Sequence, residues 1–142
     1  MLVLCGLFSP EPKEHQRVGW PAEQPVNETQ VCGGDFAASV KPAAKWQRDE
    51  ALTRYGKRPE DFTGDLDLLI PAALGGTTDP DNMWPQTTGG ELNMDAKNKL
   101  EDKLHEMVCT DKKLTLKQAQ DAIKKDWVKA YKQYVEGQAA AK

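Results

Sequence analysis

The sequence predicts a single, helix-rich α+β domain. Three segments of the 142-residue chain carry apolar residues at helical spacing, and one short stretch alternates apolar and acidic residues before a glycine pair, as a strand entering a hairpin does. Hydrophobic residues make up 39% of the chain and charged residues 29%, which is typical of a folded domain. A chain of this length buries one core without needing a second domain.

The helical segments are defined by their apolar stripes and by their end signals. The first covers residues 45–56 and the second begins at Glu91, and each shows apolar residues three and four positions apart. The third begins at Thr115, where Gln118 completes a capping box. The stripes are Trp46, Ala51, Leu52 and Tyr55; Leu92, Ala96, Leu100, Leu104, Met107 and Val108; and Ala119, Ile123, Trp127, Ala130, Tyr131 and Tyr134. Short strands are expected near Val31 and at 36–40, separated by Gly33 and Gly34.

The segments outside the helical domain have a different composition. Residues 9–28 are rich in proline and charge, so residues 1–28 are expected to form an irregular arm. Residues 136–142 predict a disordered tail, which leaves 29–135 as the domain. The first residues, "MLVLCGLF", are apolar but far too short to span a membrane. They predict either a truncated export signal or a segment that packs on the core.

The net charge limits the classes of partner. A formal charge of −3 argues against a broad electrostatic surface for nucleic acid. Lysines gather in the C-terminal half, but the acids between them favour an ordinary solvated helical face over a phosphate-binding one. The lysines are Lys97, Lys99, Lys103, Lys112, Lys113, Lys117, Lys124, Lys125, Lys129 and Lys132, and the acids are Glu101, Asp102, Glu106, Asp121 and Asp126.

The hairpin stretch, residues 64–86, reads "GDLDLLIPAALGGTTDPDNMWPQ". Apolar residues from Leu66 alternate with acidic ones as in a half-buried strand, and Gly75–Gly76 permits a tight reversal through positive φ. Asn82 is expected to tie neighbouring backbone groups, and Trp84 to anchor the core. Composition by itself favours a structural hairpin over a catalytic one.

The same stretch nevertheless resembles one branch of the HNH endonuclease family. The matching segments are Asp67, "LIP" at 69–71, "LGG" at 74–76, "DPDN" at 79–82, "WPQ" at 84–86, "KNKLEDKLHEMVC" at 97–109 and "LTLKQAQDAIKKDWVKAYKQY" from 114 onward, with "TQVC" and "VKP" upstream. The resemblance is collinear over roughly residues 29–135, which is far more specific than a lone short motif.

The resemblance implies a ββα-metal finger packed against two or more additional helices. In that family a hairpin presents a catalytic histidine as general base, and the helix after it supplies ligands to a divalent cation bound at the scissile phosphate. An asparagine orients the imidazole, and Asn82 takes that position here. A pairing of Cys32 with Cys109 is also implied, which would contribute about 4 kcal/mol and indicate an exported or cell-surface protein. A cytoplasmic protein with two reduced cysteines is the alternative.

This chain departs from the family pattern at both histidine positions. The general-base position after Asp67 is Leu68, which has no lone pair to accept a proton. The metal-binding histidine of the helix is replaced by Asp95, and a following aspartate by Asn98. Asp67, Asp95 and Asn98 remain as a candidate set for Mg²⁺ or another divalent cation, bound weakly if at all.

The chain is therefore interpreted as a degenerate HNH-endonuclease-like domain, catalytically impaired, with at most weak metal and nucleic-acid binding. One alternative is an active divalent-metal-dependent DNA endonuclease that uses Asp67 and Asp95. Another is a structural protein that reuses the scaffold for homo-oligomer contacts through the N-terminal arm or Cys5. No transmembrane segment is expected.

Overall fold

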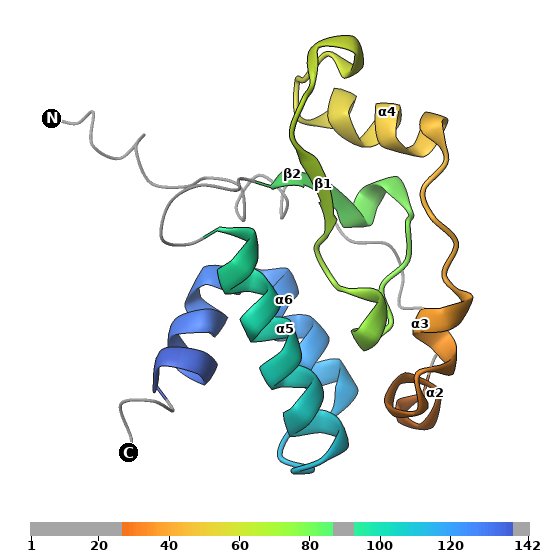
Figure 1. Ribbon diagram of the computed structural model, residues 1–142. Helices are drawn as coiled ribbons and strands as arrows, with labels where there is room; N and C mark the ends of the chain where they lie inside the picture. Colours follow the sequence, from red (N-terminus) through yellow and green to blue (C-terminus); the bar gives the residue numbers. More distant parts are fainter. Residues whose placement is uncertain (1–26, 87–92, 138–142) are drawn as a thin grey trace, which may run out of the picture.

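The computed structural model describes residues 27–86 and 93–137 and has the expected α+β composition, with a two-stranded sheet among helices (Figure 1). The helices are α2 (Glu28–Gly33), α3 (Asp35–Ser39), α4 (Lys45–Arg54), α5 (Met94–Cys109) and α6 (Leu116–Tyr131), and the strands are β1 (Asp65–Leu68) and β2 (Met83–Gln86). Short 3-10 turns occupy Pro59–Asp61, Ala72–Leu74 and Pro80–Asn82, and a π-helical turn, Lys132–Glu136, follows α6. The predicted arm and tail lie largely outside the described residues.

The two long helices form the larger layer of the fold. α5 and α6 lie side by side, whereas α4 lies against β2 on the other side of the sheet (Figure 1). The capping box predicted at Thr115 is present, because the Gln118 amide donates to Thr115 Oγ1 and the Gln118 side chain accepts from the Thr115 amide. α6 bends at Asp126, whose carboxylate caps the turn beyond it by accepting from the Lys129 amide.

The core lies between these helices and the hairpin. Trp84 is 1% exposed, as predicted for a core anchor, and its ring lies 6.4 Å from that of Trp127 in a tilted arrangement. The buried apolar residues are Val31, Leu69, Ile70, Leu74, Trp84, Ala96, Leu100, Leu104, Val108, Leu116, Ala119, Ile123, Trp127 and Ala130. The stripes predicted for the second and third helices therefore account for much of the core.

The prediction of strands near Val31 and at 36–40 is wrong, since both segments are helical. The Asn27 side chain caps α2 by accepting from the Gln30 amide, and the Gln30 side chain accepts in return from Asn27. Gly34 then adopts the left-handed conformation at φ 84° and separates α2 from α3. The glycine pair therefore marks the junction of two short helices.

The prediction that Trp46 lies in the apolar stripe of its helix is also wrong. It is 66% exposed on α4, while Ala51 and Leu52 are buried. At about 100° per residue, positions five and six residues further on lie about 140° and 240° around the helix from Trp46. The tryptophan therefore faces away from the side of α4 that packs on the hairpin.

The strands pair antiparallel, with Asp67 opposite Trp84 and Leu68 opposite Met83. They are not joined by the predicted tight reversal, since residues 69–82 form a longer loop that contains two 3-10 turns. Gly75 adopts φ 94°, which favours glycine. Glycine is required at position 76 because the backbone there lies close to Ile70: a Cβ would be 1.7 Å from the Ile70 carbonyl oxygen.

The Cys32–Cys109 disulfide implied by the resemblance is present, with the two Cα atoms 5.4 Å apart and 77 positions separating the residues. It joins the last turn of α2 to the last residue of α5. No helix in the described ranges is long and apolar enough to cross a membrane.

Candidate functional site

The centre of the candidate site is a lysine that is completely buried between β1 and α5. Lys97 is 0% exposed, although it is one of the longest charged side chains in the chain. Its ammonium nitrogen, Nζ, donates a hydrogen bond to the Leu68 carbonyl oxygen at 2.8 Å and another to Glu101 Oε2 at 2.5 Å. Nζ also lies 2.8 Å from Asp67 Oδ2. A fully buried cation is rare unless it is paired, and here three oxygens surround it.

Each of these oxygens is placed by a different part of the local structure. The β1–β2 register turns the Asp67 side chain toward α5, and the next peptide presents the Leu68 carbonyl. Glu101 lies one helical turn after Lys97, so both side chains share a face of α5. The ammonium thus links the strand to the helix across 29 positions of sequence.

The carboxylates in the cluster outnumber the cation. Asp67 and Glu101 have side chains that are 18% and 14% exposed, and one ammonium neutralises only one of them. Burial raises the pKa of Glu101 to about 7, with the Asp67 charge adding to the rise and Lys97 opposing it. Near neutral pH the cluster therefore holds a proton on Glu101 for much of the time.

Asp67 Oδ2 has an unusual environment within this cluster. The atom is buried and, within the described part of the chain, accepts no hydrogen bond. Its close partner is the Lys97 ammonium. The carboxylate predicted to bind a metal is therefore directed at a cation that the chain itself supplies.

The Leu68 position contributes backbone but no catalytic group. Its side chain is partly buried, and its carbonyl oxygen is occupied by Lys97. His105, the histidine within the described ranges, lies 3.6 Å from Cys109 Sγ through its Nε2, beside the disulfide. The other histidine, His15, lies outside the described residues. No imidazole is therefore seen to replace the missing base beside Asp67.

Asn82 ties the loop together, as the sequence analysis predicted. Its side chain is 0% exposed; Oδ1 accepts from the Ile70 amide at 2.9 Å, and Nδ2 donates to the Ile70 and Thr77 carbonyls, each at 2.9 Å. Both hydrogens of the amide nitrogen are therefore used within the loop. The resemblance implies that Asn82 orients a catalytic imidazole. Position 68 is leucine, so there is no imidazole at that position to orient.

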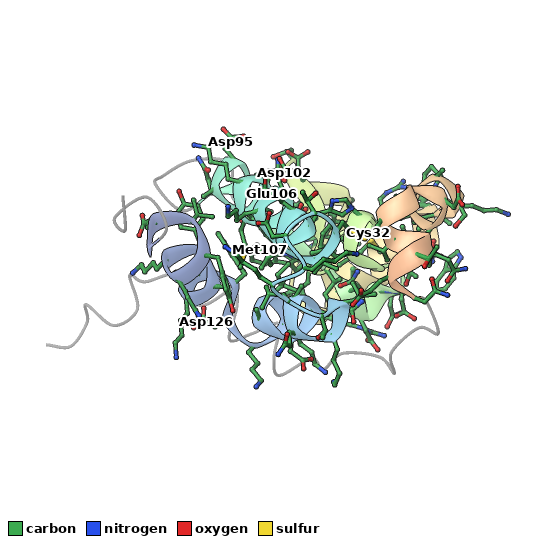
Figure 2. All side chains as sticks on the ribbon, turned by 90° about the horizontal axis from the view of Figure 1, so that it is seen from below. Cys32, Asp95, Asp102, Glu106, Met107 and Asp126 are labelled. Carbon is green, nitrogen blue, oxygen red and sulfur yellow. A yellow bond between two sulfur atoms is a disulfide. The ribbon has the colours of Figure 1, made fainter. Side chains whose placement is uncertain are left out.

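The structure does not bring Asp95 and Asn98 to Asp67. Both are exposed on α5, and Figure 2 shows Asp95 at the outer edge of the molecule in the first turn of the helix. At about 100° per residue, Asp95 lies about 200° and Asn98 about 100° around α5 from Lys97. Lys97 marks the side of α5 that faces Asp67, because the two side chains are in contact. Asp95 and Asn98 therefore lie on other sides of the helix, away from Asp67.

The residues present do not fit a resident divalent cation. Two carboxylate oxygens and a carbonyl oxygen are ligands that Mg²⁺ and Ca²⁺ prefer, but the ammonium occupies the point on which they converge. Across residues 27–86 and 93–137, no three His, Cys, Asp or Glu side chains gather as a metal site. The cluster can hold a cation and a proton.

Sequence reasoning missed Lys97 and Glu101, which it assigned to a solvated face. That interpretation is wrong for both residues. Positions 97, 101, 104 and 108 follow the spacing of four, three and four that marks a buried stripe, so the pattern already placed the pair beside Leu104 and Val108. The prediction followed the charged nature of the two residues instead of their position on the stripe.

Comparisons with known proteins identified no relative. No family model matches the chain, and searches of curated proteins and of solved structures also gave no match. The likeness to HNH endonucleases therefore rests on the residues quoted from the sequence.

We predict that Lys97→Met lowers the free energy of unfolding by about 3–5 kcal/mol, because it leaves buried carboxylates without their cation. Lys99→Met is the matched control, since Lys99 is exposed on the same helix and should change stability by less than about 0.5 kcal/mol. Urea unfolding of the two variants measures the difference. Equal stabilities would contradict a paired buried ammonium.

We further predict a pH dependence that comes from Glu101. Its pKa is higher in the folded state, so the folded protein keeps a proton that the unfolded chain has lost between pH 4.5 and about 7. Stability should therefore fall as pH rises through this window and become constant above it, a total of about 3 kcal/mol at 1.36 kcal/mol per pKa unit.

Glu101→Gln should remove this component, whereas Glu106→Gln, at an exposed position of the same helix, should leave it unchanged. Chemical unfolding of the three proteins at several pH values isolates the component. A difference between wild type and Glu101→Gln that does not vary with pH would show that Glu101 ionises normally.

Proposed function

We propose that this chain is a degenerate HNH-endonuclease-like domain that is catalytically impaired and retains at most weak binding of divalent metal and nucleic acid. The observation that carries the proposal is the burial of the Lys97 ammonium 2.8 Å from Asp67 Oδ2. The sequence places this carboxylate in the candidate metal-binding set with Asp95 and Asn98. Here it is neutralised from within the chain.

The missing base supports the same conclusion. Removal of a positioned general base costs about 10²–10⁴ in rate, and leucine at position 68 cannot replace one. A weakened metal site adds to this loss, because the cation stabilises the charge that develops on the phosphate. The two deficits act on different parts of the reaction.

The element order is compatible with the proposed ββα finger. β1 and β2 form an antiparallel pair, and α5 is the next element described along the chain. α6 and α4 supply the additional helices that the resemblance implies. We therefore assign the finger to β1, β2 and α5 as part of the proposal.

Within the described residues, a surface beside the hairpin is a candidate for weak nucleic-acid contact. A hollow of about 300 Å³ precedes β1 and is lined by Lys57, Arg58, Asp61, Phe62, Thr63 and Gly64. A cation and an aromatic ring are the groups that contact phosphate and base in single-stranded nucleic acid. Arg58, however, pairs with Glu60 and Asp61, which reduces its charge toward a phosphate. The surface thus favours weak binding.

The Cys32–Cys109 disulfide supports export to an oxidising compartment, where such bonds persist.

The active-endonuclease alternative would require Asp67 to leave Lys97 and join Asp95. The self-assembly alternative depends on Cys5 and the N-terminal arm, which lie outside the described residues. Both remain alternatives to the proposal.

The test is a nicking assay on supercoiled plasmid with protein in stoichiometric excess and Mg²⁺ or Mn²⁺ present. We expect no nicking above the level of Asp67→Ala, because neither the base nor a free metal ligand is in place. Disulfide-intact protein with a cooperative unfolding transition must be used, so that inactivity reports on the site.

Metal-dependent nicking that Asp67→Ala abolishes would contradict the proposal and support the active-endonuclease alternative. Nicking that is equal in both proteins would indicate a contaminating nuclease and leaves the expected result in place. Binding to a labelled duplex by anisotropy, at low and moderate salt, measures the residual affinity in the same preparation.

A further inference from the structure

The oxygens around Lys97 have the arrangement of a cation site. Asp67 Oδ2, the Leu68 carbonyl oxygen and Glu101 Oε2 lie 2.8, 2.8 and 2.5 Å from one point, the Lys97 nitrogen. Two carboxylates and a backbone carbonyl form a hard, all-oxygen donor set. Ca²⁺, which accepts six to eight oxygens in flexible geometry, suits such a set better than Mg²⁺, which demands a near-ideal octahedron.

When both carboxyl groups are ionised, the cluster also carries more negative charge than its occupant balances. One ammonium faces two carboxylates, and Asp67 Oδ2 is buried without a hydrogen bond from the described residues. A divalent ion would balance both carboxylates. The lysine supplies one positive charge that is covalently attached to the chain. The cluster therefore has a cation without binding one from solution.

We propose that Lys97 is an internal cation that fills an oxygen-lined cation site between β1 and α5, so that the intact chain binds no divalent ion at Asp67 and Glu101, and that truncation of Lys97 opens this site to Ca²⁺. The divalent cation implied by the family resemblance is thus replaced by a side chain. This inference deepens the proposed function and rests on it for the loss of the metal, but its test involves no nucleic acid and no catalysis.

The truncation that tests the inference is Lys97→Ala. It removes the ammonium and most of the side chain, which leaves the three oxygens and space for water ligands. Lys99→Ala is the matched control on the exposed side of the same helix. Lys97→Ala/Asp67→Asn removes one of the proposed ligands from the opened site.

The probe is Tb³⁺, an oxygen-seeking ion of a size similar to Ca²⁺, whose emission is excited through nearby tryptophan. Trp84 pairs with Asp67 across the β1–β2 ladder, so an ion bound at Asp67 lies beside a buried indole. Trp46 is exposed near Asp49 and Glu50, and its contribution is the background seen in wild type and in Lys99→Ala.

We expect Lys97→Ala to give saturable emission that Ca²⁺ displaces, with an affinity at least tenfold above wild type and Lys99→Ala. The added Asp67→Asn change should remove this gain. Ca²⁺ should also raise the melting temperature of Lys97→Ala and leave that of wild type unchanged. If Lys97→Ala is unfolded without metal, Ca²⁺ should restore its helical circular dichroism.

Three results would overturn the inference. Saturable emission from the wild-type chain that Asp67→Asn abolishes would show that Lys97 does not exclude the ion. A folded Lys97→Ala without gain in affinity, or an unfolded one that Ca²⁺ does not restore, would show that the three oxygens form no cation site. Plasmid nicking by the wild type would instead contradict the proposed function, which the ion-binding experiment does not measure.

Discussion

A single buried ammonium connects the two halves of this fold. Lys97 lies near the start of α5, and its ammonium contacts the Leu68 carbonyl and the Asp67 carboxylate on β1. It therefore links the hairpin to the helical layer. Buried ion pairs seldom add much net stability relative to apolar packing, but the loss of one partner is costly. The cluster therefore acts mainly as a constraint: the hairpin must keep its position on α5 as long as Asp67 and Glu101 remain buried.

Other parts of the structure hold the elements that present this cluster. Asn82 closes the loop between the strands through three hydrogen bonds, which fixes the end of β1 where the Leu68 carbonyl is presented. The Cys32–Cys109 disulfide ties α2 to the far end of α5. Glu28, at the start of α2, accepts a hydrogen bond from the Leu116 amide at the start of α6. The oxygens around Lys97 are thus held by a surrounding framework that is itself cross-linked.

Much of this framework follows from the sequence, whereas for the cluster the spacing on α5 indicates only that Lys97 and Glu101 are buried. The helical stripes and the capping box at Thr115 depend on spacing within one helix, and both were predicted. Asn82 was predicted because its side chain bonds to nearby backbone, which is local chemistry. The contact of Lys97 with Leu68 spans 29 positions and depends on how the hairpin docks, which no local pattern reports. The short helices α2 and α3 were missed because their few residues carry too little periodicity.

The state of the Lys97 ammonium itself is the most direct test of this interpretation. Heteronuclear NMR of lysine side chains labelled with ¹⁵N reports whether the hydrogens on each Nζ exchange slowly enough to be seen. We expect one ammonium signal, absent from Lys97→Met, to exchange far more slowly than those of exposed lysines such as Lys99. If Lys97 exchanged as fast as Lys99, the ammonium would be solvated, and the internal cation between β1 and α5 would be contradicted.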